Sequence, residues 1–426
     1  MSFKQMFKMS IFTDVLKRGD TVIACNTGCG THLKMPVECW ETIEQYITAY
    51  TPAQICDAAC EEDRDYYEQI FKLMVEKRIL VSDREWLETV DIAITNRCNL
   101  QCKHCAASAG TLSEKEILST TQWKVIIDRV LAVEPKMIVL TGGEPMIRED
   151  FFELTEYIRK RFTGKLDLMT NSLLINHDNV DRIIRNYDHI SVSIDGYDEE
   201  TCAAIRGKGV FDRVINAVNL LIERRFDKNA ISLSMVETAV TYGKMDRFRE
   251  LCDSLGVKCV PRLFSAVGRG EENRDGLMPK QLEQEDNDKW ERLLNRAEEE
   301  EIQQEAPNSQ VTFQCRSCTA GRGIISIDSN GNIYPCQVLM EQEFLLGNAL
   351  ICEDLYSMIV ENQGIRTKGL HNYEQLLKGT DPQCAECDVE PFCKYCVGVE
   401  SYMQECSNSE CKRKKDFLTK IVWGMV

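Results

Sequence analysis

Three cysteines stand close together directly after an apolar stretch of the chain. Cys98, Cys102 and Cys105 lie in the run TNRCNLQCKHCA, which follows ETVDIAIT. Closely spaced cysteines bind iron–sulfur clusters or zinc in proteins. A 4Fe-4S cluster takes four thiolates, so a loop that supplies three leaves one iron open to a small molecule. The run predicts an iron–sulfur site with one open position, and zinc or unliganded thiols are the alternatives.

A second motif, VLTGGEP, joins an apolar strand to Gly142, Gly143, Glu144 and Pro145. Glycine lets the backbone approach a ligand closely, and a carboxylate accepts hydrogen bonds from an ammonium group. Together the two motifs resemble those of the radical S-adenosylmethionine (SAM) enzymes. The resemblance implies that this second loop binds SAM, with Glu144 receiving the ammonium of its methionine moiety.

The same resemblance implies a reaction. SAM binds the open iron through its amino and carboxylate groups, and an electron from a flavodoxin- or ferredoxin-like donor cleaves a carbon–sulfur bond. The resulting 5′-deoxyadenosyl radical removes a hydrogen atom from the substrate in a dry cavity. Cys98, Cys102 and Cys105 are therefore expected to be both metal ligands and the catalytic centre.

Strands must alternate with helices to position these loops. Apolar residues at helical spacing, including Trp123, Val125 and Ile126, follow the first strand candidate, and Phe151 to Ile158 follow the second. This alternation predicts an α/β fold with a parallel sheet, a partial (β/α)6 TIM-like barrel whose chemistry lies at the carboxyl ends of its strands. The six strand candidates are residues 89–95, 136–142, 165–171, 189–195, 230–236 and 257–264.

Later strand ends offer further SAM contacts by resemblance. Asn171 follows the third strand, Ser193 lies in the fourth, and Arg206 comes in the next segment. In relatives, such a Ser and Arg hold the ribose or carboxylate of the cofactor, and a guanidinium can bind a carboxylate through two hydrogen bonds. The structural alternative for Asn171 is a strand-end turn, and for Ser193 it is a hydroxyl that only satisfies a local hydrogen bond. For Arg206 it is a solvated turn.

Ten of the 21 cysteines lie after residue 314. Twelve residues separate Cys318 from Gly331, four separate Gly331 from Cys336, and a Cys-x2-Cys-x5-Cys run begins at Cys384. This arrangement resembles the SPASM extension of radical enzymes that modify peptides, and Asn330-Gly331 predicts a hairpin within it.

The SPASM resemblance implies two auxiliary 4Fe-4S clusters, and so three clusters in all. It assigns Cys315, Cys318, Cys336 and Cys396 to the first, and Cys384, Cys387, Cys393 and Cys411 to the second. Only two residues separate Cys393 from Cys396, where relatives have three, so Cys396 is the weakest assignment, and Cys406 is an alternative last ligand. One or two structural zinc sites are the competing interpretation.

The other cysteines lack a clear ligand pattern. Cys202, Cys252, Cys259 and Cys352 are expected to be small buried side chains. The five cysteines near the N-terminus are interpreted as inert thiols, with a metal site as the alternative; they are Cys25, Cys29, Cys39, Cys56 and Cys60.

The N-terminal region has a pattern of its own. Strands are expected within residues 10–26 and 31–37, and helices over 38–47, 51–59 and 63–80. This order resembles the small winged-helix peptide-recognition domain fused to maturases of ribosomally made peptides. The resemblance implies that a leader peptide adds to a strand edge. A structural cap is the alternative, and DNA binding is disfavoured because acidic residues outnumber basic ones.

Composition limits the remaining possibilities. The 426 residues exceed one usual core, so we expect a winged-helix-like domain over 1–88, the barrel over 89–270, an acidic helical linker over 271–310 and a SPASM domain over 311–426. The net charge of −17 argues against a nucleic-acid partner. Neither a membrane-length apolar run nor a signal peptide is evident, which predicts a cytoplasmic protein with no membrane partner, where thiols remain reduced.

These features predict a peptide maturase. It would install an intramolecular crosslink, a thioether or a carbon–carbon bond, in a precursor peptide that carries a leader. A sulfatase-type maturase is the second interpretation; there an acid follows the cysteine that matches Cys336, whereas this chain has Gln337. A radical peptide epimerase is the third, and a non-catalytic zinc-bound scaffold or regulator represents a different class.

Overall fold

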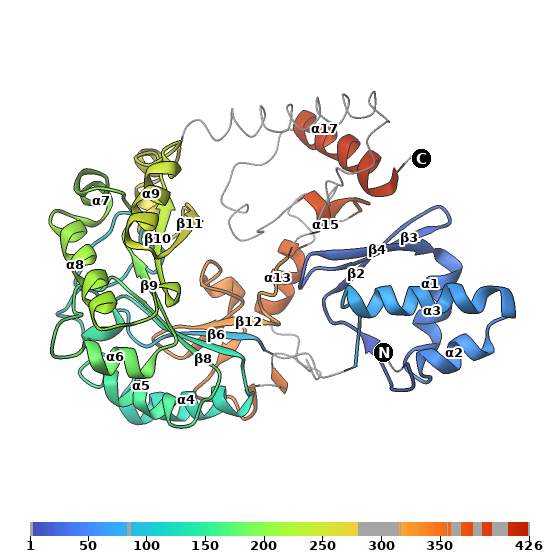
Figure 1. Cartoon of the computed structure of the whole chain (residues 1–426), viewed down its shortest axis with the longest axis horizontal. Coiled ribbons are helices and arrows are strands. Elements are labelled where there is room, and N and C mark those ends of the chain that lie inside the picture. The colour runs from blue at the N-terminus through green and yellow to red at the C-terminus, as the bar shows by residue number, and fades with distance from the viewer. Residues whose placement is uncertain are drawn as a thin grey trace. The chain divides into compact units, whose positions relative to one another are not determined.

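The computed structural model describes residues 3–82, 87–279, 315, 317–355, 357–358, 368–377, 386–393 and 408–424 (Figure 1). The chain divides into two compact units. The smaller combines Met1–Glu85, Glu283–Thr319 and Gln375–Val426, and the larger combines Trp86–Leu282 and Ala320–Glu374. Each unit is described by itself.

Six parallel strands form the main part of the larger unit. They lie in the order β11-β10-β9-β8-β7-β6, and all six strands expected from the sequence are confirmed. Strands β6 to β10 bury apolar side chains, whereas β11, at one edge of the sheet, is partly or fully exposed along its length. The strands are β6 (Thr89–Ala93), β7 (Met137–Thr141), β8 (Lys165–Thr170), β9 (His189–Ser193), β10 (Ile231–Glu237) and β11 (Lys258–Leu263).

Helices connect successive strands, as parallel pairing requires. Helix α4 begins with a capping box in which Ser119 and Gln122 satisfy each other's backbone N–H groups. Trp123 and Ile126 are buried, but the expectation that Val125 shares their face is wrong: it is 39% exposed, because a position two residues after Trp123 lies nearly on the opposite side of the helix. The helices are α4 (Thr120–Ala132), α5 (Phe151–Arg159), α6 (Val180–Asn186), α7 (Glu199–Arg206), α8 (Val210–Glu223), α9 (Met245–Leu255), α10 (Arg269–Glu272) and α11 (Arg274–Leu277).

Three later strands extend the same sheet beyond β6. β12 (Ile324–Ile327) pairs with β6 in parallel, and β13 (Asn332–Tyr334) and β14 (Gly347–Asn348) follow in antiparallel pairing. Gly331 has φ +80° in the turn between β12 and β13, which confirms the hairpin expected at Asn330-Gly331. A segment expected to belong to the C-terminal extension thus completes the edge of the barrel sheet. Helix α13 (Lys368–Leu377) follows in this region.

A three-stranded antiparallel sheet forms the centre of the smaller unit. β2 (Thr13–Arg18), β3 (Thr21–Asn26) and β4 (Thr31–Pro36) pair in sequence order, so the single stretch expected at 10–26 is in fact a hairpin. Helices α1 (Val37–Tyr46), α2 (Pro52–Ala58) and α3 (Glu61–Glu76) follow close to their expected positions, and β1 (Lys8–Met9) pairs with β5 (Leu80–Val81).

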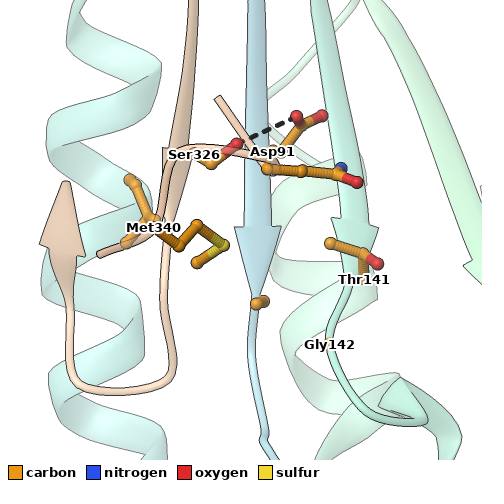
Figure 2. A pocket seen from close by; sticks show the side chains of 8 residues that line it. Asp91, Thr141, Gly142, Ser326 and Met340 are labelled. Atoms are coloured by element: carbon orange, nitrogen blue, oxygen red, sulfur yellow. Dashed lines mark hydrogen bonds between the residues drawn. The ribbon is translucent and has the colours of Figure 1, made fainter. Parts of the chain in front are cut away.

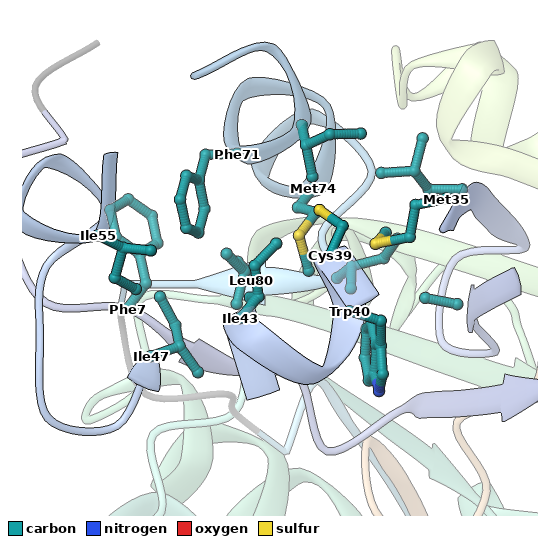
Figure 3. Close-up of a cluster of buried hydrophobic side chains, with 14 of the residues drawn as sticks. Phe7, Met35, Cys39, Trp40, Ile43, Ile47, Ile55, Phe71, Met74 and Leu80 are labelled. Carbon is teal, nitrogen blue, oxygen red and sulfur yellow. The ribbon is translucent and has the colours of Figure 1, made fainter. Parts of the chain in front are cut away.

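The sheet of the smaller unit has a buried core on each face. Val22 and Ala24 of β3 face the three helices, where Trp40, Ile43 and Phe71 fill the helical core (Figure 3). Ile23 and Cys25 lie in a second cluster, the C-terminal core, with side chains from α15 (Glu390–Cys393), α17 (Asn408–Thr419) and η5 (Lys420–Gly424). Alternation along one strand therefore supplies both cores.

Candidate active site

The cysteine loop follows β6, and the glycine loop follows β7, at the carboxyl edge of the sheet. Backbone hydrogen bonds join the two loops, from Gly143 N to Thr95 O at 2.9 Å and from Glu144 N to Arg97 O at 2.8 Å. Cys98 and Cys102 are buried within this contact, and Cys105 is partly exposed. The two motifs that the sequence singled out thus form one packed structure.

Both glycines are required by this loop-to-loop contact. A Cβ atom at Gly142, which has φ +141°, would lie 2.3 Å from Thr95 O. A Cβ atom at Gly143 would lie 2.3 Å from Arg97 O. Any side chain would push the two loops apart, since both neighbours are backbone atoms. The sequence suggested that these glycines approach a ligand; the structure adds that they approach the cysteine loop itself.

Hydrogen-bond donors surround the three sulfurs. The backbone N–H groups of Leu100 and Ala109 lie 3.4 Å from the Sγ atoms of Cys98 and Cys105, respectively. Arg206 Nη1 lies 3.8 Å from Cys102 Sγ, and Asn171 Nδ2 lies 4.0 Å from Cys98 Sγ. Donors directed at sulfur favour thiolates and tune iron–sulfur clusters.

His104 adds a second observation that fits a bound group. It lies between two of the cysteines, and its Nδ1 atom is buried without a hydrogen-bond partner among the described residues. Three thiols, several N–H donors and one orphaned ring nitrogen in a single loop suit a 4Fe-4S cluster with a ligand beside it. No three described His, Cys, Asp or Glu side chains are placed to hold a single metal ion.

Glu144 ties the glycine loop to the end of β8. It is fully buried; its Oε2 accepts from Asn171 N at 2.8 Å, and its Oε1 accepts from Thr170 Oγ1 at 2.8 Å and from Met146 N at 3.2 Å. Burial raises the pKa of Glu144 to about 7, although these hydrogen bonds act in the opposite direction. Both carboxylate oxygens are thus engaged by the chain itself.

A buried ion network supports the other side of the cysteine loop. Asp195 Oδ2 lies 2.7 Å from both His104 Nε2 and Arg206 Nε, and Asp195 Oδ1 accepts from Val236 N at 2.7 Å. Burial alone would raise the pKa of Asp195, but Arg206 and His104 outweigh it and hold this pKa below its usual range. The network links the cysteine loop to β10 and to the end of α7.

Arg148 braces the same loops and was not anticipated from the sequence. Its buried guanidinium donates to Ile94 O at 3.1 Å, to Glu116 Oε2 at 3.0 Å and to Asp150 Oδ1 at 2.8 Å. Glu116 also accepts from Arg97 at 3.0 Å. A positive charge just after the GGEP run was the available signal, but only the fold reveals its partners.

The remaining expected site residues lie in several places. Pro145 begins a short 3-10 turn after Glu144, and Ser193 ends β9 opposite Ser234 of β10. Cys336 belongs to the larger unit, whereas Cys315, Cys318, Cys387, Cys393 and Cys411 belong to the smaller. Cys384, Cys396 and Cys406 lie outside the described residues.

A small cavity opens beside Gly142, inside the sheet. Asp91 of β6 enters it and accepts a hydrogen bond from Ser326 Oγ of β12 at 3.1 Å (Figure 2). Burial raises the pKa of Asp91 to about 6, against hydrogen bonds from Ser326 and Gln337 and the charge of Arg262. The cavity encloses about 60 Å³, and its lining residues are Asp91, Ala93, Thr141, Gly142, Ser326, Ile327, Gln337 and Met340.

Asp91 was also missed in the sequence. An acid in the middle of an otherwise apolar strand was the available signal, because alternation sends its side chain away from the helices. Its hydrogen-bond partner, Ser326, lies in β12, 235 positions later in the chain.

The fold and site together define a parallel α/β barrel with a three-thiol loop at the carboxyl ends of its strands. A sequence model of the Radical SAM superfamily matches residues 92–252. The mycofactocin maturase MftC of Mycobacterium ulcerans is 31% identical over 265 residues, which cover 60% of this chain and 70% of that protein. The chain therefore belongs to the radical SAM superfamily, and it is related to mycofactocin maturases.

Other relatives place limits on this likeness. MftC of Mycolicibacterium smegmatis is 31% identical over 264 residues, and the match spans 60% of this chain and 66% of that protein. The AdoMet-dependent heme synthase of Methanosarcina barkeri is 27% identical over 328 residues, which cover 71% of this chain and 89% of the synthase. The relatives thus agree on the superfamily, but their names describe different activities.

Solved structures support the fold. Streptococcus suis SuiB bound to precursor peptide SuiA matches with a TM-score of 0.55 and 15% identity, covering 95% of this chain and 97% of that one. The structure of anSMEcpe with bound AdoMet matches with a TM-score of 0.52 and 19% identity, covering 79% and 96%. Among the helices that the structure describes, none has the length and apolar character to cross a membrane.

We predict that Gly143→Ala separates the cysteine and glycine loops. The added Cβ would meet the carbonyl oxygen of Arg97 at 2.3 Å. Such overpacking against backbone costs about 3 kcal/mol, so the free energy of unfolding should fall by that order. Urea unfolding would measure it. Gly276→Ala is the control, because nothing lies within 4 Å of its added Cβ; equal stability of the two variants would contradict the contact.

We predict a pH-dependent effect of Asp91→Asn. Because burial raises the pKa of Asp91 from 3.8 to about 6, the folded chain holds this proton more tightly than the unfolded chain. The stability contributed by neutral Asp91 is present below pH 4 and is lost as the pH rises to about 6. Wild type should therefore lose roughly 1.5 kcal/mol relative to the variant between pH 5 and 7.5. Urea unfolding would measure the free energy of unfolding of both proteins. A difference between them that stays constant from pH 5 to 7.5 would contradict the raised pKa of Asp91.

Proposed function

We propose that this chain is a radical SAM peptide maturase that forms an intramolecular crosslink in a ribosomally made precursor peptide. The contact of the thiol loop with the glycine loop, directly beside the Asp91 cavity, carries the proposal. When bound, a 4Fe-4S cluster and SAM supply a carbon-centred radical that removes an unactivated hydrogen atom. The new bond is a thioether or a carbon–carbon bond.

The chain's own residues would position these groups. Cys98, Cys102 and Cys105 hold the cluster, and Asn171 and Arg206 orient the sulfurs and the cofactor. The backbone of Gly142 and Gly143 faces the methionine moiety, while Glu144 keeps that backbone in place. Ser193 lies at the same carboxyl edge and is the proposed ribose contact. The substrate residue enters above Asp91, in a space that the barrel shields from water.

The peptide substrate is supported by relatives and by the smaller unit. MftC is named a maturase, and SuiB has been solved with a precursor peptide. The sheet of the smaller unit has two edges, at β2 and β4, and either could accept a leader peptide as an added strand. We propose that residues 1–88 form this winged-helix-like recognition domain.

The C-terminal cysteines are proposed to hold two auxiliary clusters in a SPASM domain over 311–426. These clusters would accept the electron left over when the new bond forms, and a flavodoxin- or ferredoxin-like protein would reduce the first cluster. We further propose that the protein works in the cytoplasm, where such donors and reduced thiols occur.

The presence of Gln337 favours a crosslinking enzyme over a sulfatase-type maturase. Its amide hydrogen-bonds Asp91 and cannot act as a base, although an acid is expected there in sulfatase-type enzymes. The relatedness to heme synthases makes tetrapyrrole modification the competing activity. Offering the reconstituted chain both peptides encoded beside its gene and a tetrapyrrole, then recording product masses, separates the two; a change in the tetrapyrrole alone would reject the maturase.

We predict that Cys98→Ala, Cys102→Ala and Cys105→Ala each abolish the release of 5′-deoxyadenosine under strong reductant. Each variant should also lose about four irons per chain, because the cluster at this site has only three cysteine ligands and two would not hold it. Chromatography and iron analysis measure both. Cys202→Ala is the control, since Cys202 is a buried cysteine that lies in α7, outside the cysteine loop. Full release from any of the three loop variants would disprove the site.

We predict that proline at alternate positions of β2 leaves the sheet folded but blocks binding of the leader peptide. Along an edge strand, every second N–H points away from the partner strand, and only those positions tolerate proline. Val15→Pro and Leu16→Pro sample both orientations. The variant that folds should weaken binding of a leader peptide at least tenfold in fluorescence anisotropy, while release of 5′-deoxyadenosine stays unchanged. Unaltered binding would exclude β2 as the docking edge.

A further inference from the structure

A short segment after the last barrel strand lies against the cysteine loop. β11 ends at Leu263, and residues 268–273, which include α10, follow it in the chain. Arg269 N donates to Cys105 O at 3.0 Å, so the backbone of this bracing segment meets the backbone of the loop. Both belong to the larger unit. Arg269 was not singled out in the sequence, because its partners lie more than 150 positions earlier.

The approach of the two backbones leaves no space for a side chain at Gly268. This residue has φ +56°, and a Cβ atom there would lie 2.4 Å from Ala106 O and 2.7 Å from Cys105 O. Both neighbours are backbone oxygens, which cannot move aside unless the loop itself moves. Gly268 therefore allows the bracing segment to lie directly on the turn that carries Cys105.

The side chain of Arg269 holds two further carbonyl groups of the same loop. Its Nε donates to Cys102 O at 3.1 Å, and its Nη1 donates to Ala109 O at 2.7 Å. A guanidinium is a rigid planar set of donors, so it holds two separate carbonyls in one fixed arrangement, which the flexible ammonium of lysine does not. Asn273 Nδ2 donates to a third carbonyl, Lys103 O, at 3.2 Å.

These hydrogen bonds act on the residues that surround the sulfur atoms. Cys102 and Cys105 are two of the three thiols of the loop, and Ala109 N lies 3.4 Å from Cys105 Sγ. Arg269 binds the carbonyl group of each of these three residues. A carbonyl oxygen directed toward Arg269 does not face the sulfurs, where its partial negative charge would repel thiolates. The loop is thus held in an arrangement that suits a bound cluster.

The guanidinium of Arg269 also places a positive charge behind the loop. Its side chain is half-buried, where charges are screened less than at an exposed surface. The two side-chain hydrogen bonds go to uncharged carbonyl oxygens, so these bonds leave its charge in place. Reduction makes an iron–sulfur cluster more negative, and the charge around a cluster is one of the factors that set its potential. A positive charge at this position favours the reduced cluster.

We propose that Arg269 is a positioning residue for the iron–sulfur cluster: it fixes the cysteine loop through its carbonyl groups and raises the reduction potential of the cluster. The proposal rests on the part of the proposed function that places a 4Fe-4S cluster on Cys98, Cys102 and Cys105. The alternative is an arginine that only closes the end of the barrel. Such an arginine would affect the stability of the fold, but its loss from a folded variant would leave the potential unchanged.

Two substitutions separate the charge of Arg269 from its hydrogen-bond geometry. Arg269→Gln removes the charge, whereas Arg269→Lys keeps the charge and loses the planar set of donors. The full chain is reconstituted anaerobically with iron and sulfide, and EPR at controlled potentials follows the reduction of its clusters. The signal of the loop cluster is the one that the Cys102→Ala variant lacks. A chelator added to the oxidised protein measures the rate at which this cluster loses iron.

At a fixed potential, Arg269→Gln should lower the ratio of reduced to oxidised loop cluster about tenfold, which corresponds to about 59 mV for one electron. Arg269→Lys should stay close to the wild-type ratio. Both variants should lose iron to the chelator faster than wild type, because the loop carbonyls are no longer held. Arg249→Gln is the matched control: it removes the same charge from α9, where Arg249 is 59% exposed and pairs with Asp246, so it should change neither quantity.

A wild-type ratio in a folded Arg269→Gln variant would overturn the proposal, and so would an equal fall in the glutamine and lysine variants. If Arg269→Gln does not fold, Arg269→Lys decides: a wild-type rate of iron loss would then overturn the proposal. A wild-type chain that shows no loop-cluster signal would instead reject the proposed function itself. Failure to crosslink a peptide while the loop cluster behaves as expected would reject the maturase and leave the role of Arg269 standing.

Discussion

The close approach of two backbone segments is the constraint on which the site depends. The glycine loop after β7 lies against the start of the cysteine loop after β6, and neither Gly142 nor Gly143 has room for a Cβ atom. This contact fixes where the thiols stand relative to the sheet. The Arg148 network and the Asp195 network add further hydrogen bonds to the cysteine loop and its surroundings, so that contacts from the chain itself hold a loop that has no regular structure.

Local patterns predicted much of this architecture. Six strands, the helices between them and the Asn330-Gly331 hairpin follow from alternation, helical spacing and turn chemistry, which act over a few residues. The hairpin within residues 10–26 was missed although Gly19-Asp20, the two residues between β2 and β3, is a recognised turn pair, and Gly19 adopts φ +55° there. The exposure of Val125 follows from helical spacing itself, because a position two residues after Trp123 lies nearly on the opposite side of α4.

What the sequence did not indicate depends on contacts between distant segments. The pairing of β12 with β6 creates the Asp91 cavity, and Asp91 acquires its raised pKa only through that burial. The same holds for Arg148, whose partners Ile94 and Glu116 come from other segments of the chain. The cysteine and glycine motifs were recognisable because each carries its chemistry within a few residues, whereas these other groups derive theirs from the fold.

Glu144 illustrates how a recognisable residue can have more than one task. The chain already supplies three donors to its two oxygens, and the side chain is fully buried. To accept an ammonium it would use its remaining lone pair or give up an internal bond, and an unpaired buried donor costs about 1–3 kcal/mol. The carboxylate therefore serves first to link the loop after β7 to the end of β8 through hydrogen bonds. We expect the backbone carbonyls that it positions, on the glycine side of the loop, to carry much of the recognition of a cationic ligand.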